Sequence, residues 1–292
     1  MKRIIDVSHP IRDADPCSFG TSDNRPSISY EEGESHGVFF ITSRVDNLHS
    51  NTCTHIDFPG HLSGMAEKFG DSIGKYPVER FVGSVAVLDF SAKIDSIRPF
   101  FDDSGVLAIK PGDAETLSKF LHALDELRIT GNELQQALTR CGASSALKGI
   151  LFYTGLSSLW QYKKFESWQY LYFYNPYLSS DACEFILAQN YSFVGIDSFQ
   201  LEHPIINFRG DELPVVTDRQ GREFIAARLS DINMKFSNHL ALLGNDILIY
   251  ENLKLPTECR DRIVDFSGVP LNFQIAGLND NGLTRPYISC MV

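Results

Sequence analysis

Paired cysteines are the first feature that this sequence lacks. Its 292 residues include six cysteines, at positions 17, 53, 141, 183, 259 and 290, and none of them forms a C-x-x-C pair. Cysteines so few and so widely spaced exclude a disulfide scaffold, which needs many of them in a short chain. We therefore predict reduced, mostly buried thiols in a cytoplasmic protein.

Long apolar runs are also missing. No uninterrupted run approaches the ~18 residues that a membrane-spanning helix requires. The opening residues Met1 to Asp6 are charged and lack the apolar segment of a secretory signal. The sequence thus predicts neither a transmembrane helix nor a signal peptide.

Positive charge is scarce. Lysine and arginine total 26 against 37 aspartates and glutamates, which gives a formal net charge of −11. Binding to nucleic acid needs a basic face, and binding to a membrane surface is favoured by a basic amphipathic stretch; neither is evident. The expected partner is a small-molecule substrate.

The composition is otherwise that of a globular protein, with 43% hydrophobic and 22% charged residues. Short apolar runs that predict strands alternate with helical patterns, which favours the α/β class and a single domain over residues 1–292. Residues 11–36, rich in Asp, Ser, Gly and Pro, are predicted to be a loop. The expected strands are 4–7, 38–45, 85–90, 149–154, 191–197, 246–250 and 269–276, and the expected helices are 114–127, 130–141, 181–189 and one that ends at Gly244.

The segment 51–61 carries the first group of chemically active side chains. In an extended backbone, residues at even offsets share one face, so His55, Asp57 and His61 can point into one pocket. Asn51 and His49 have the same parity. Imidazole and carboxylate groups this close suit a divalent transition metal such as zinc or manganese. The alternative for the pair at 55 and 57 is a buried, hydrogen-bonded couple without a metal.

A second group lies near the C-terminal end of the chain. A predicted helix carries His239, turns at Gly244, and leads into a strand that delivers Glu251 at its end. The turn reverses the chain, so these two polar groups can meet at one edge of a sheet. The alternative is a partly exposed histidine on the helix and an ordinary acidic residue at the strand end.

Together these residues resemble a known family. The segment from Asn51 to His61 looks like the H-x-G-T-H-x-D-x-P-x-H signature of the cyclase-like metal hydrolases, which include bacterial kynurenine formamidase and isatin hydrolase. The similarity extends over most of the chain, through the segments 4–10, 76–83, 153–155, 178–179, 194–197 and 251–253. The resemblance implies an α/β fold of the swivelling β/β/α type. It also implies homodimers or higher homo-oligomers.

The resemblance also implies roles. His55 and Asp57 match metal ligands of the motif, and His239 and Glu251 match the downstream ligands. His61 matches the histidine that acts as general acid and base. The implied reaction is hydrolysis of an amide, a cyclic amide (lactam), an ester or a lactone by a metal-bound hydroxide, and the implied enzyme resembles an arylformamidase. The aromatic residues Phe58, Phe19, Trp160 and Trp168 are candidates for the wall of an apolar substrate pocket.

Two positions depart from the signature. Asn51 stands where the motif has its first histidine ligand, and an amide oxygen binds zinc more weakly than imidazole does. We therefore predict one ion rather than two, with Asn51 as a weak ligand and His49 as a possible substitute. Cys53 stands where the motif has glycine. Segments 96–145 and 156–178 are predicted to be insertions without a motif of their own.

These departures leave two other functions open. One is a catalytically impaired family member that binds a metal or a small molecule, as the loss of a ligand at Asn51 suggests. The other is nucleophilic catalysis by Cys53 with His55 or His61, although no oxyanion-binding element is evident.

Overall fold

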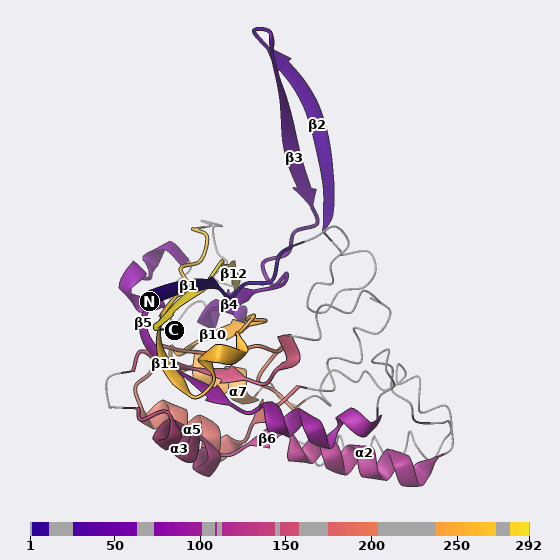
Figure 1. Ribbon diagram of the computed structural model, residues 1–292, viewed down its shortest axis with the longest axis vertical. Coiled ribbons are helices and arrows are strands. Elements are labelled where there is room, and N and C mark those ends of the chain that lie inside the picture. The colour runs from indigo at the N-terminus through magenta and orange to yellow at the C-terminus, as the bar shows by residue number, and fades with distance from the viewer. Residues whose placement is uncertain are drawn as a thin grey trace.

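A curled sheet of nine strands forms the body of the protein (Figure 1). The computed structural model describes residues 2–11, 26–62, 73–100, 109, 113–143, 147–157, 175–203, 237–272 and 281–291. In spatial order the strands are β1 (Lys2–Asp6), β13 (Tyr287–Met291), β11 (Arg262–Ser267), β5 (Val82–Asp89), β7 (Gly149–Tyr153), β9 (Phe193–Ile196), β10 (Leu248–Glu251), β4 (His55–Asp57) and β12 (Asn281–Leu283).

The centre of the sheet is parallel and its flanks are antiparallel. Strands β5, β7, β9 and β10 pair in parallel. Every residue of β7, β9 and β10 is buried, as expected for strands covered on both faces. Strand β4 pairs antiparallel with β10 on one side and with β12 on the other. This arrangement brings residues 55–57 beside the end of β10.

Three helices cover one face of the sheet. These are α3 (Gly131–Arg140), α5 (Ser180–Ala188) and α7 (Ser237–Leu243), which share one hydrophobic core with β5, β7, β9 and β10. Thr130 and Glu133 form the predicted capping box at the start of α3. A further helix, α2 (Ala114–Glu126), lies beside this layer, and a short parallel pair joins β6 (Arg128–Ile129) to β8 (Tyr177–Leu178). Short 3-10 helices occupy Pro59–His61, Ile73–Lys75, Val78–Phe81, Ser91–Ser96, Arg98–Phe100 and Thr257–Cys259.

A second core fills the other face, where the sheet curls. Alternate residues of β10 divide between the two cores: Leu248 and Tyr250 enter the second core, whereas Ile249 enters the helix-covered one. Strand β4 follows the same rule, since Ile56 lies in the second core. Glu251 and the two residues that flank Ile56 consequently share the helix-covered face, below α7.

A long hairpin leaves the body. It consists of β2 (Ser27–Ser35) and β3 (Val38–Asp46) and projects away from the sheet (Figure 1). The sequence predicts β3, but the prediction of a loop over 11–36 is wrong for residues 27–35. Serine, glutamate and glycine mask the strand pattern of β2, and β3 supplies its hydrogen bonds.

The α/β class is confirmed, and the prediction for the end of the chain is corrected. Of the predicted strand 269–276, the described residues 269–272 form no strand, and among them only Pro270 pairs, through an isolated bridge to Thr284; the last strands are β11, β12 and β13. Leu134, Ala137 and Leu138 of α3, within the segment 96–145, belong to the main core, and the assignment of this segment as an insertion stays a prediction. Much of the segment 156–178 lies outside the described residues.

The described cysteines and helices agree with two predictions. Cys53, Cys141, Cys183, Cys259 and Cys290 carry free thiols. Cys17 lies outside the described residues. Among the helices that are described, none has both the length and the apolar character that crossing a bilayer would require.

Candidate metal centre

Four side chains from three elements meet on the helix-covered face of the sheet. Strand β4 supplies His55 and Asp57, the end of β10 supplies Glu251, and α7 supplies His239. The β4–β10 register places Glu251 directly opposite His55. All four are nearly inaccessible to solvent, with exposed fractions of 1% to 5%. The two segments that the sequence singled out therefore form one site.

The spacing of these groups suits a cation between them. His55 Nε2 lies 3.4 Å from Asp57 Oδ1 and 3.5 Å from Glu251 Oε2. His239 Nε2 lies 3.4 Å from Asp57 Oδ2 and 3.3 Å from Glu251 Oε1. Each carboxylate thus turns one oxygen to each imidazole. These distances exceed the usual ~2.9 Å of an N–H···O hydrogen bond. They are distances that two ligand atoms can have when each lies ~2.1 Å from one zinc ion.

Hydrogen bonds fix which nitrogen of each histidine faces the carboxylates. His55 Nδ1 lies 2.9 Å from the carbonyl oxygen of Cys53. His239 Nδ1 lies 2.9 Å from Glu202 Oε1, which also accepts the backbone N–H of His239. Both acceptors require a proton on Nδ1, so the neutral imidazoles present the lone pair of Nε2 to the site. A carboxylate–histidine pair of this kind is the usual support of a metal ligand.

The buried carboxylates of the site favour a positive charge beside them. Burial lowers the pKa of His55, but the neighbouring carboxylates of Asp57 and Glu251 raise that pKa to about 10. Burial also lowers the pKa of His239, but Asp57, Glu202 and Glu251 outweigh this effect and raise that pKa well above its usual value. Burial raises the pKa of Asp57, but the neighbouring imidazoles of His239 and His55 have the larger, opposite effect. They hold that pKa well below its usual range. A divalent ion would satisfy the same demand with both imidazoles neutral.

The donor set fits a metal ion. Ligand atoms of His55, Asp57 and Glu251 all lie within 4.8 Å of one another. Asp57 Oδ2 and Glu251 Oε1 are buried and have no hydrogen-bond partner among the residues that the structure describes, which is costly for charged oxygens unless a cation neutralises them. Two imidazole nitrogens and two carboxylates are ligands that zinc accepts, and the two negative charges balance one divalent ion.

Comparison with known proteins gives the family. The family model for the Cyclase family matches residues 5–203, well over half of the chain. This chain belongs to the Cyclase family. A search of curated protein sequences finds no match.

Solved structures share the fold of this Cyclase-family chain. An isatin hydrolase bound to the product analogue thioisatinate aligns over 99% of this chain and 92% of its own, with 14% identity and a TM-score of 0.67. Isatin hydrolase A from Ralstonia solanacearum aligns over the same shares, with 15% identity and a TM-score of 0.64. A protein described as a predicted metal-dependent hydrolase from Bacillus stearothermophilus aligns over 99% and 98%, with 17% identity and a TM-score of 0.57. At these identities the likeness shows the fold.

His61 stands at the edge of this Cyclase-family site. It ends the 3-10 turn Pro59–His61, which directly follows β4, and it is less buried than the four central groups. Its ring centroid lies 6.3 Å from that of His239. A partly exposed imidazole beside a buried charged group is placed to exchange protons with a bound molecule. The proton-transfer role of His61 stays a prediction.

The residues upstream of His55 occupy a tight turn. Asn51 is half-buried in this turn, and its role as a ligand stays a prediction. The side chain of His49 is exposed and lies outside the buried group. Thr54 Oγ1 accepts the backbone N–H of His9 and lies 2.5 Å from the carbonyl oxygen of Asn252, to which it donates. Thr54 therefore ties the chain after β1 to the end of β10.

The backbone conformation of Cys53 explains why the family signature has glycine at this position. Its φ is +54°, in the left-handed region that favours glycine. This conformation aims its carbonyl oxygen at His55 Nδ1 and Asn252 Nδ2. The thiol sulfur lies 4.0 Å from the carbonyl oxygen of Pro10 and does not belong to the group of candidate ligands found among the described residues. The contacts favour packing over nucleophilic catalysis.

A pair of substitutions tests whether the left-handed backbone conformation of Cys53 is strained. Cys53→Gly and Cys53→Ala both remove the buried sulfur, but only glycine relieves the left-handed strain. We expect the glycine variant to be about 1 kcal/mol more stable than the alanine variant. Urea denaturation of both variants measures this difference. Equal stability would contradict the assignment of strain to this turn.

Of the aromatic residues predicted to line a substrate pocket, Phe58 lies among the described residues and the others do not. Phe58 is fully buried in the second core, where its ring centroid lies 5.2 Å from that of Tyr76 and 6.2 Å from that of Phe81. Phe58 thus lies in the same core as Ile56, and its role in lining a substrate pocket stays a prediction. Phe19, Trp160 and Trp168 lie outside the described residues.

Two supporting residues escape the sequence analysis. Glu202, with an exposed fraction of 2%, holds Nδ1 of His239, and Asn281 Nδ2 donates to Asp57 Oδ1 over 2.6 Å. Asn281 faces Asp57 across the β4–β12 pair. Neither residue belongs to a motif. In the sequence, the only indication of Glu202 is that an acidic residue follows shortly after the apolar run that ends at Asp197.

Proposed function

We propose that this protein is a metal-dependent hydrolase that cleaves an amide, a cyclic amide or an ester of a small molecule. One observation carries the proposal. Two buried imidazoles with fixed Nδ1 protons face two buried carboxylates, and two of the carboxylate oxygens lack a hydrogen-bond partner in the described part of the chain. Membership in the Cyclase family and the shared fold with isatin hydrolases support hydrolysis of a cyclic or aryl amide.

Different residues of this chain would bind the metal, transfer the proton and support the ligands. His55, Asp57, His239 and Glu251 would hold one zinc or manganese ion, with Asn51 as an additional weak ligand. A divalent ion in such a site lowers the pKa of a water and polarises a carbonyl oxygen. His61, at the open edge, takes a proton from the attacking water and returns it to the leaving nitrogen or oxygen. Glu202 and Asn281 keep the ligands in place.

Metal analysis and a substrate panel test the proposal. Protein purified without added metal is expected to contain about one equivalent of zinc or manganese per chain. It should hydrolyse at least one member of a panel containing isatin, N-formyl aryl amines and aryl esters. Chelation should abolish turnover, and the added ion should restore it.

The same experiment identifies the other candidate functions. Bound metal with no turnover across the panel, and no effect of His61→Ala on ligand binding, would favour a metal-binding or small-molecule-binding protein. Turnover that ignores chelators but is lost to thiol reagents would favour a cysteine nucleophile.

A further inference from the structure

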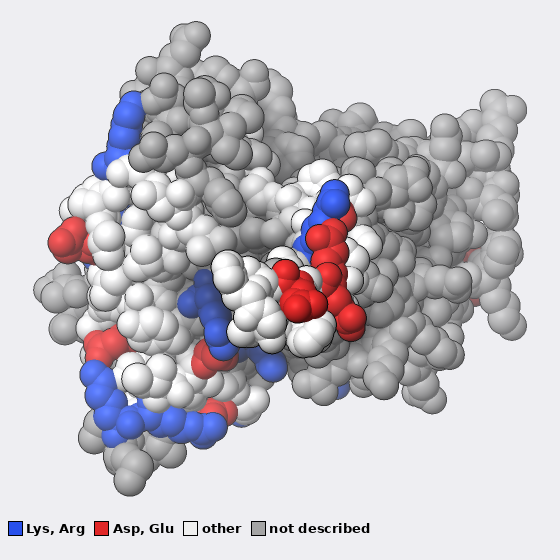
Figure 2. Space-filling view, turned by 90° about the horizontal axis from the view of Figure 1, so that it is seen from above, with Lys and Arg blue, Asp and Glu red and all other residues white. Residues whose placement is uncertain are grey.

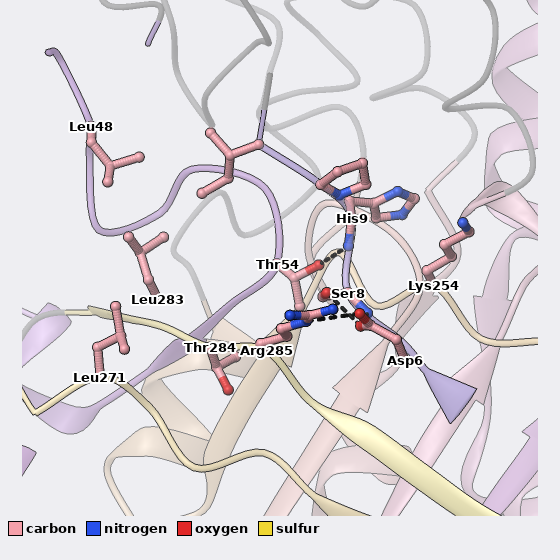
Figure 3. A pocket seen from close by; sticks show the side chains of 12 residues that line it. Asp6, Ser8, His9, Leu48, Thr54, Lys254, Leu271, Leu283, Thr284 and Arg285 are labelled. Atoms are coloured by element: carbon pink, nitrogen blue, oxygen red, sulfur yellow. Dashed lines mark hydrogen bonds and ion pairs between the residues drawn. The ribbon is translucent and has the colours of Figure 1, made fainter. Parts of the chain in front are cut away.

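A cavity of about 520 Å³ opens at the base of the β2–β3 hairpin (Figure 3). It is separate from the candidate metal centre, because none of the four candidate ligands lines it. Its volume falls within the ~300–1,000 Å³ of cavities that bind small molecules. The described part of the chain therefore contains a second candidate binding site.

The two ends of this cavity differ in chemistry. Figure 3 shows Leu48, Leu271 and Leu283 at one end, and His9 with Lys254 at the other. Leu48 follows β3 by two residues and extends the exposed apolar side chains of that strand. A ligand that fills the cavity would therefore meet an apolar wall at one end and polar groups at the other.

The polar end carries one positive charge that is not balanced. Arg285 Nε lies 2.8 Å from Asp6 Oδ2, so these two charges neutralise each other. Burial raises the pKa of Asp6, but hydrogen bonds from Ser8 and Arg285 lower it below its usual value, and the pair remains ionised. The ammonium group of Lys254 has no ion-pair partner among the residues that the structure describes. It is thus open to a negatively charged ligand.

Hydrogen bonds hold the lining of the cavity together. Thr54, with an exposed fraction of 3%, accepts the backbone N–H of His9 and donates to the carbonyl oxygen of Asn252. The backbone N–H of Lys254 donates to the carbonyl oxygen of Val7 over 2.8 Å. These bonds join three segments that are distant in the sequence, so the cavity is formed before a ligand enters. A preformed cavity keeps the entropic cost of binding low.

The face from which the hairpin projects is not uniformly acidic. The whole chain has a formal net charge of −11, but Figure 2 shows Lys and Arg side chains together with Asp and Glu side chains on this face. A small anion can approach such a mixed surface. A long polyanion would also meet the exposed glutamates of β2, at positions 31, 32 and 34, which disfavours nucleic acid as the ligand.

We propose that this cavity binds a small organic carboxylate that has an apolar body. The carboxylate pairs with the ammonium group of Lys254, and the apolar body packs against Leu48, Leu271 and Leu283. One unbalanced positive charge matches one negative charge. A neutral ligand would leave Lys254 without a counter-charge, and a small inorganic anion would leave the three leucines in contact with water.

Titration of the full-length protein with benzoate tests the proposal. Isothermal titration calorimetry is expected to give a dissociation constant below about 1 mM. Benzamide has the same shape without the charge, and acetate has the charge without the ring, so each should bind about 10-fold more weakly. Absence of benzoate binding, or benzamide that binds as tightly as benzoate, would overturn the proposal.

Substitutions distinguish the cavity from the metal centre, where a carboxylate could also bind. Lys254→Gln removes the charge of an exposed side chain and should weaken benzoate about 10-fold with an unchanged melting temperature. Lys119→Gln removes the same charge from α2, outside the cavity, and is the matched control that should bind like wild type. His55→Ala removes a candidate metal ligand and should also retain benzoate. Binding that survives Lys254→Gln but is lost in His55→Ala would place benzoate at the metal centre and overturn the proposal.

Leu271→Asn tests the apolar end of the cavity. Leu271 is 54% exposed, so the substitution should leave the fold intact. Loss of part of the apolar wall should weaken benzoate about 5-fold and leave acetate unchanged. Benzoate that binds this variant like wild type would overturn the placement of the apolar body against the leucines.

Discussion

Replacing His61 by alanine is expected to lower kcat by about 10²–10⁴-fold and to leave the metal content unchanged. General acid–base catalysis by a positioned side chain contributes about this factor. His61 is the one imidazole of the group that is partly exposed at the edge, whereas His55 and His239 are buried against the carboxylates. The measurement is steady-state hydrolysis of the best substrate in the panel, with elemental analysis of the same sample.

The matched control for His61→Ala is His55→Ala, six residues earlier on β4. Its imidazole faces both carboxylates, so its removal should eliminate metal and turnover together. If both variants lost metal equally, His61 would be a ligand and its assignment as acid and base would be wrong. The pH profile gives a second readout, because loss of His61 should remove one limb of the kcat curve.

Asp57→Ala is expected to abolish uptake of the metal ion. Its two oxygens face both histidines, and its loss leaves two imidazoles and one carboxylate around the centre. Removing one partner of a buried charged group typically destabilises a protein by about 3–5 kcal/mol, so the melting temperature should fall as well. Equilibrium dialysis against zinc, together with circular dichroism, separates lost binding from lost folding.

Glu202→Gln provides the graded comparison for Asp57→Ala. It keeps the shape of the residue that holds His239 Nδ1 but removes the charge that orients this ring. Metal affinity should fall about 10–100-fold without being abolished, the usual cost of disturbing the partner of a ligand. A Glu202→Gln variant that binds metal like wild type would contradict the supporting role of Glu202.

The candidate site was largely predictable because its parts are local. His55 and Asp57 share a face through strand alternation, and Ile56 between them enters the opposite core, as the same rule requires. The turn after α7 brings His239 back towards Glu251 within thirteen residues. In both segments a short-range period of the chain fixes the direction of the side chains.

Longer-range supports could not be predicted in this way. Asn281 reaches Asp57 only because β12 pairs with β4 across 224 positions of sequence, and Glu202 reaches His239 from an irregular segment. Strand β2 was missed because its polar composition lacks apolar alternation, and its structure depends on pairing with β3. The burial of Phe58 in the second core could not be predicted either, because aromatic character alone does not state which face a residue takes.

By itself, the sequence determined the α/β class, the family signature and which residues can serve as metal ligands, since these follow from local periodicity and side-chain chemistry. Only the tertiary structure decided that the two ligand pairs meet, which nitrogen each histidine presents, and that an apolar hairpin stands exposed. Those features depend on pairing between distant strands, and no local pattern encodes the order in which strands join a sheet.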